Sequence, residues 1–75
     1  MSTAQQVFDQ AFSTPRNARS PAYKRGVMDC LLARLESTDM PVSYPNGSAE
    51  LDAYCSGWTE GGVLASAQRG QQEAA

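Results

Sequence analysis

Cys30 and Cys55 are the side chains of this 75-residue sequence with the greatest capacity for covalent chemistry. A reactive cysteine needs a nearby cation or base that holds it as a thiolate. The sequence contains no histidine, which excludes Ser–His and Cys–His nucleophile pairs and removes the usual zinc ligands. The two cysteines also lack the Cys-x-x-Cys spacing of a redox pair. We therefore interpret both as small, buried, apolar residues.

The other residue types that support catalysis or cofactor binding form no known pattern. The glycine-rich stretch 57–62 has no lysine followed by Ser or Thr, so it is not a phosphate-binding loop. Glu50 and Asp52 lie where carboxylates favour the positive end of a helix dipole. Asp29 and Glu36 fit solvated helix positions. We therefore expect a protein that is not an enzyme and that has no cofactor and no metal.

A basic segment is the remaining candidate site. Arg16, Arg19, Lys24 and Arg25 lie within ten residues that contain no acid, and Tyr23 lies among them. Such residues supply salt-dependent affinity for nucleic acid, and the tyrosine could stack on a base. The alternative is a solvated linker followed by a helix start. The sequence leaves both interpretations open.

Acidic residues dominate the later part of the chain. The net charge is −2, and no Lys or Arg lies between Glu36 and Gln68. A basic end and an acidic end are therefore expected, a pattern typical of nucleic-acid contact or head-to-tail association. Glu50, Asp52 and Trp58 are candidate contacts for a protein partner, because Trp, Tyr and Arg are frequent anchors of interfaces.

Local signals place a short helix at the N-terminus and a flexible tail at the C-terminus. Thr3 with Gln6, or Ser2 with Gln5, makes a capping box, which predicts a helix within residues 1–14. Residues 15–20 read as a basic linker. Residues 66–75 are rich in Gln and Ala and have nothing to bury, so we expect a flexible tail there.

A helical hairpin is predicted between these two segments. Ser20 followed by Pro21 is a strong helix start, and the helix should run to about Glu36. Ser48 caps a second helix. The predicted fold is therefore all-α: an antiparallel helical hairpin over residues 21–65 plus the short N-terminal helix.

A short pattern occurs once in each helix of the hairpin. The segment Ala22-Tyr23-Lys24-Arg25-Gly26 returns as Ala53-Tyr54-Cys55-Ser56-Gly57. Glycine inside a helix costs stability, so a close approach of another backbone or ring is the expected compensation. This predicts close helix packing at Gly26, Gly57 and Gly61, either within the hairpin or against a partner chain.

The antiparallel arrangement makes a specific prediction for this pattern. Folding the chain about Val42 places Cys30 opposite Cys55. In that register Gly26 and Gly57 do not face each other, and each meets the far turn of the other helix.

The size and composition of the chain limit its core. A domain of fewer than about 80 residues rarely obtains more than about 3–5 kcal/mol from a single core. We therefore expect stabilisation by dimerisation or by a partner protein. No stretch approaches a membrane span and the first residues do not form a signal peptide, so we expect a cytoplasmic protein.

The residues of the hairpin resemble the ribosome modulation factor family. The resemblance covers about residues 20–62 and rests on the segments 22–26, Ser43-Tyr44-Pro45 and 53–61. It implies two helices and a linker, contact with ribosomal RNA, and translational silencing with ribosome dimerisation. Two features differ from the family: this chain is acidic, and its connection reads Ser-Tyr-Pro in place of Cys-Pro-Tyr.

Two functions follow from these observations. The first is a small protein-binding regulator or inhibitor, for instance a phage-encoded protein that acts on a host protein complex through exposed aromatics and its acidic surface. The second is a ribosome or rRNA binder similar to ribosome modulation factor, with its cations on phosphates. The acidic composition favours the first.

Overall fold

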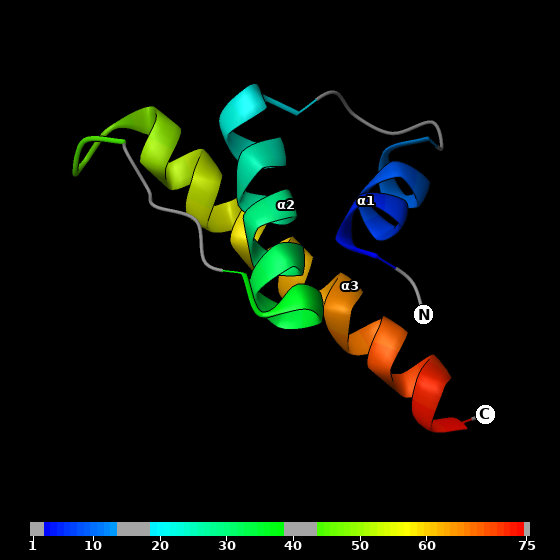
Figure 1. Cartoon of the computed structure of the whole chain (residues 1–75). Coiled ribbons are helices and arrows are strands. Elements are labelled where there is room, and N and C mark those ends of the chain that lie inside the picture. Colours follow the sequence, from blue (N-terminus) through cyan, green and yellow to red (C-terminus); the bar gives the residue numbers. More distant parts are fainter. Residues whose placement is uncertain (1–2, 14–18, 39–43, 75) are drawn as a thin grey trace.

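Three helices form the described part of the chain (Figure 1). The computed structural model describes residues 3–13, 19–38 and 44–74, with the side chains of 69 and 71–74 excepted. Helix α1 spans Ala4–Ser13, α2 spans Pro21–Glu36 and α3 spans Ala49–Ala74. These residues contain no strand, and α2 and α3 pack closely, which confirms the all-α fold with a hairpin and a short N-terminal helix.

Each helix begins where its capping residues predict. The Thr3 amide donates to Gln6 Oε1 at 2.9 Å, and the Gln6 amide donates to Thr3 Oγ1 at 3.1 Å, which completes the capping box. Ser20 Oγ accepts from the amide of Tyr23 at 3.2 Å. Ser48 Oγ accepts from the amide of Leu51 at 3.1 Å. These hydrogen bonds satisfy amides that a helix start leaves without a partner.

The crossing of α2 and α3 is made at the repeated glycines. A Cβ on Gly26 would lie 2.9 Å from the Trp58 nitrogen, and one on Gly57 would lie 3.1 Å from the Val27 nitrogen. A Cβ on Gly61 would lie 2.6 Å from Cys30 Cβ. The distances at Gly26 and Gly61 are shorter than real Cβ contacts, and a Cβ on Gly57 would also overlap the carbonyl oxygen of Tyr23. The helices therefore could not approach this closely with side chains at those positions. All three glycines therefore serve close packing, as the pattern predicts.

The direction of the crossing differs from the antiparallel prediction. The starts of α2 and α3 lie together and line the same hollows, and the two helices run from there in the same general direction (Figure 1). Gly26 and Gly57 consequently meet at one crossing, and Cys30 lies beside Gly61 rather than Cys55. The 16 residues of α2 span about 24 Å. Residues 37–48 can reach about 40 Å when extended, enough to return to that side.

Helix α3 also extends beyond the predicted end of the hairpin at residue 65. It remains helical from residue 66 to Ala74, where the sequence suggested a flexible tail. The residues of this segment are mainly Ala, Gln, Glu and Arg, which have high helix propensity. Helix propensity therefore accounts for the continuation of α3 beyond residue 65.

The core joins all three helices. Ala4 and Val7 from α1 pack with Val27 and Leu31 from α2 and Ala65 from α3. Helix α1 is also held by a hydrogen bond from the amide of Ala4 to Glu36 Oε2 at 2.8 Å. Glu36 is exposed, as expected, and its carboxylate at the end of α2 also caps the start of α1.

None of the helices in the described ranges is long and apolar enough to cross a lipid bilayer.

Candidate partner-binding surface

The described part of the predicted basic segment does not form one positive patch. Arg19, Lys24 and Arg25 are all exposed, but each lies beside a different neighbour. The Arg19 guanidinium lies 4.7 Å from the centre of the Tyr23 ring, and Lys24 Nζ lies 6.0 Å from the centre of the Phe12 ring. Arg16 lies outside the described residues. The described cations therefore spread around the start of α2.

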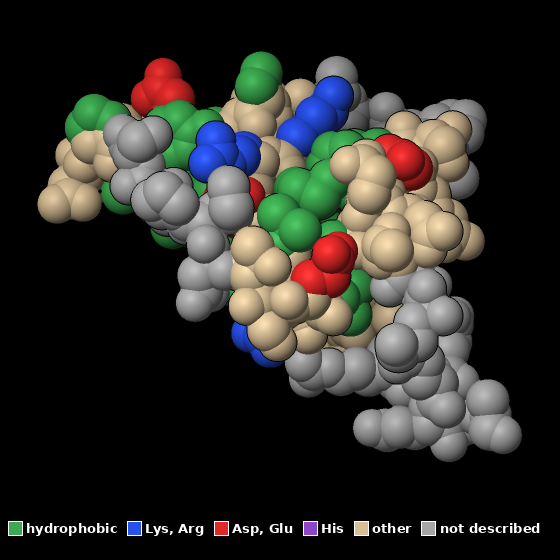
Figure 2. Space-filling view, viewed as in Figure 1, with side chains coloured by type: hydrophobic (Ala, Val, Ile, Leu, Met, Phe, Trp, Pro, Cys, Tyr) green, Lys and Arg blue, Asp and Glu red, His purple; other side chains and the backbone are tan. Residues whose placement is uncertain are grey.

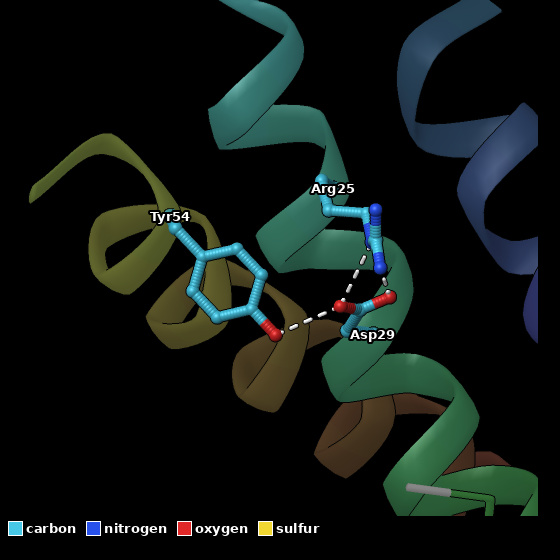
Figure 3. Close-up of polar contacts among 3 residues, drawn as sticks. All are labelled: Arg25, Asp29 and Tyr54. Carbon is cyan, nitrogen blue, oxygen red and sulfur yellow. Dashed lines mark hydrogen bonds and ion pairs between the residues drawn. The ribbon is translucent and has the colours of Figure 1, made fainter. Parts of the chain in front are cut away.

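Arg25 takes part in a buried polar cluster with Asp29 and Tyr54 (Figure 3). Arg25 Nε donates to both carboxylate oxygens of Asp29, at 3.1 and 3.2 Å, and the Tyr54 hydroxyl donates to Asp29 Oδ2 at 2.8 Å. The Asp29 side chain is only 3% exposed, which corrects its predicted solvated position. A buried carboxylate needs such partners, because an uncompensated buried charge is strongly unfavourable.

The same cluster raises the pKa of Tyr54. Burial, the hydrogen bond to Asp29 and the negative charge of Asp29 raise the pKa of the Tyr54 phenol far above its usual value. The hydroxyl, which is protonated at neutral pH in any case, therefore remains a donor to the carboxylate at alkaline pH as well. The cluster joins α2 to α3 near their crossing, so its first role is structural.

Tyr23 is also engaged with α3. Its hydroxyl donates to Glu60 Oε1 at 2.5 Å, and the Arg19 guanidinium covers one face of its ring. A tyrosine held in this way has less freedom to stack on a nucleic-acid base than the sequence suggested. Tyr23 therefore contributes mainly to the contact between α2 and α3.

Acidic and basic residues lie at the same end of the molecule. Arg19 and Tyr23, at the start of α2, line an open hollow of about 340 Å³ together with Asp52 from α3. Figure 2 shows Lys and Arg side chains interspersed with Asp and Glu side chains on the viewed face. Among the described residues, the separate basic and acidic ends predicted from the sequence do not appear, because the two helix starts lie together.

A second hollow at this end is mainly apolar, and we call it the Tyr44 groove. It encloses about 520 Å³ between the starts of α2 and α3 and is lined by Ser20, Pro21, Ala22, Tyr44, Ala49, Glu50 and Ala53. Glu50 is exposed. The Tyr44 ring lies 5.7 Å from the Tyr54 ring, which carries the hydroxyl bound to Asp29. The buried cluster thus supports one wall of the groove.

Trp58 belongs to a different surface. It is half-buried, and its ring lies 6.1 Å from the Tyr54 ring. On its other side it lines an open hollow with Arg34 and the exposed Val63. Trp58 therefore packs against the helix crossing with one part and faces solvent with another.

The described residues contain neither a candidate metal-binding group nor a disulfide. They contain no group of three His, Cys, Asp or Glu side chains that could hold a metal ion. Cys30 is buried and Cys55 is exposed, and neither is in a disulfide. Only Cys30 therefore fits the predicted buried apolar role, and Cys55 faces solvent because the helices do not run antiparallel.

Sequence reasoning missed the Tyr44 groove and the role of Asp29. The groove forms where two helix starts and a loop tyrosine meet, and no local pattern encodes that meeting. Asp29 had one local signal, an arginine four residues earlier on the same helix face. Its tyrosine partner lies 25 positions away in the sequence.

Comparison of the chain with protein-family models, curated proteins and solved structures finds no significant match.

Proposed function

We propose that this chain is a small non-enzymatic regulator or inhibitor that acts in the cytoplasm by binding another protein through the Tyr44 groove. The observation that carries the proposal is the groove itself: about 520 Å³ of mainly apolar space with an exposed carboxylate. Ligand sites commonly enclose about 300–1,000 Å³, with apolar walls and few polar groups. The groove therefore has the size and character needed to accept a side chain of a partner.

The distribution of charge supports a protein partner over a nucleic acid. A phosphate that approaches Arg19 would also meet Asp52, because both residues line one hollow. Arg25 already pairs with the buried Asp29. A nucleic-acid surface normally presents clustered Lys and Arg, whereas mixed charges are compatible with a protein interface.

A ribosome or rRNA binder similar to ribosome modulation factor is the second candidate. One observation favours it: Arg19, Lys24 and Arg25 are all exposed, so phosphates could reach each of them. This function predicts affinity that falls steeply with salt, because each neutralised phosphate releases counterions. A protein partner that binds through an apolar groove predicts a weaker dependence on salt.

Affinity capture from the lysate of the host cell distinguishes the two functions. Tagged protein is used as bait with and without nuclease treatment, at low and at moderate salt. We expect one protein partner that survives nuclease. Recovery of ribosomal proteins that disappear after nuclease treatment would instead establish the second candidate and overturn the first.

A further inference from the structure

We propose that the Tyr44 groove recognises a segment of the partner protein in which an apolar side chain lies next to a lysine or arginine. This inference rests on the proposed protein-binding function and specifies its target. The occupant follows from two properties of the groove, its apolar walls and the sign of its charge.

The walls of the groove suit a single medium-sized or large apolar side chain. Ala22, Ala49 and Ala53 have short side chains, so they leave space between the two helix starts. Pro21 and the ring of Tyr44 provide further apolar surface. Burial of an apolar side chain against such walls is favourable because it removes apolar surface from water. Binding of an apolar group in the groove is therefore energetically favourable.

The charge at the groove selects the neighbour of that apolar group. Among the described residues that line the groove, Glu50 is the one that is charged at neutral pH, and it is exposed. A lysine or arginine beside the anchored side chain would meet this carboxylate, whereas an acidic neighbour would be repelled. Exposed charge pairs of this kind affect partner choice and association rate more than final affinity.

The Tyr44 wall of the groove packs against the buried Tyr54. Tyr44 lies against Tyr54, and the Tyr54 hydroxyl is bound to the buried Asp29 carboxylate. Because Tyr54 is only 4% exposed, its ring provides a fixed surface for Tyr44. A preformed wall reduces the ordering cost of binding.

Selection from a random heptapeptide library displayed on phage tests this inference with the intact chain as bait. We expect enrichment of peptides that carry an apolar residue within two positions of a lysine or arginine. A synthetic version of the most enriched peptide should bind the Ala49→Gln variant about tenfold more weakly or worse, because the longer polar side chain enters the groove. Ala67→Gln is the matched control, an exposed alanine on the same helix, and should bind like the unchanged chain.

Charge reversal tests the second part of the inference. Selection on Glu50→Lys should shift the enriched neighbours from basic to acidic residues, whereas Asp9→Lys on α1 should leave them unchanged. Circular dichroism establishes that each variant retains its helices. Enriched peptides that are acidic, or that bind Ala49→Gln as well as the unchanged chain, would overturn the inference.

The same variants separate this inference from the proposed function. If the nuclease-resistant partner is captured equally by Ala49→Gln, the chain binds a protein elsewhere, and only the groove assignment fails. If no protein survives nuclease treatment, the proposed function itself fails.

Discussion

At the residue scale, the glycines at the helix crossing are sensitive to substitution. A Cβ on Gly57 would overlap the backbone carbonyl of Tyr23, which cannot move without separating the helices. Gly57→Ala should therefore lower the free energy of unfolding by about 1–3 kcal/mol, despite the better helix propensity of alanine. Urea denaturation measures this change.

Gly62 provides the matched control for this prediction. It lies in the same helix, but a Cβ there would meet no atom within 4 Å. Gly62→Ala should therefore raise the free energy of unfolding by about 0.5–1 kcal/mol. Stabilisation of similar size by both substitutions would contradict the close packing of α2 against Gly57.

The Tyr54 hydroxyl is the second residue-scale determinant. Tyr54→Phe removes the donor to Asp29 Oδ2 and leaves a buried carboxylate with fewer partners. The free energy of unfolding should fall by about 1–3 kcal/mol. Tyr44→Phe keeps the Tyr54–Asp29 hydrogen bond and should cost less in the same denaturation experiment.

The same hydroxyl predicts a loss of stability at alkaline pH. The pKa of Tyr54 is raised in the folded chain above its ordinary value of 10.0, by burial first and by Asp29 second. The unfolded chain therefore loses this proton at a lower pH than the folded chain. The hydroxyl's contribution to the free energy of unfolding is therefore fully present below pH 10 and decreases as the pH rises above 10. Between about pH 9 and 11, the free energy of unfolding measured by denaturation should decrease more steeply with pH for the unchanged chain than for Tyr54→Phe. Equal slopes would refute the raised pKa of Tyr54.

At the element scale, α1 depends on α2 for its stability. It has 10 residues, which is marginal for an isolated helix. The Glu36 carboxylate accepts a hydrogen bond from the amide of Ala4. Glu36→Ala should therefore lower the free energy that stabilises α1 by about 1 kcal/mol. Amide hydrogen exchange within α1 should then become about fivefold faster. Glu50→Ala removes an exposed carboxylate elsewhere and should leave exchange in α1 unchanged.

The helix starts and their arrangement in space differ in how far the sequence predicts them. Thr3, Ser20 and Ser48 cap their helices as expected, because capping depends on residues within one turn. The prediction that α2 and α3 run antiparallel was wrong. The direction of the crossing depends on how far residues 37–48 can reach, and no local signal in the sequence reports this. The Tyr44 groove could not be predicted for the same reason, since it exists only where the two helix starts meet.

At the scale of the whole molecule, the described core is small. Its largest fully buried side chains are Leu31, Val27 and Cys30. A core of this size supplies about 3–5 kcal/mol. Leu31→Ala costs about 2–5 kcal/mol at a well-packed site. This substitution should therefore leave most of the chain unfolded at room temperature, as circular dichroism would show.

A ligand that binds the folded chain should offset this weakness. A free ligand concentration of about 100 times the dissociation constant adds about 2.7 kcal/mol to the free energy of unfolding, because only the folded chain contains the groove. The selected basic–apolar peptide should therefore raise the thermal midpoint of the unchanged chain and restore helicity to a partly unfolded variant such as Leu31→Ala. The peptide should not stabilise Ala49→Gln, whose groove is filled. A small unstable core and a preformed groove would then be connected, because partner binding would set how much of the protein is folded in the cell.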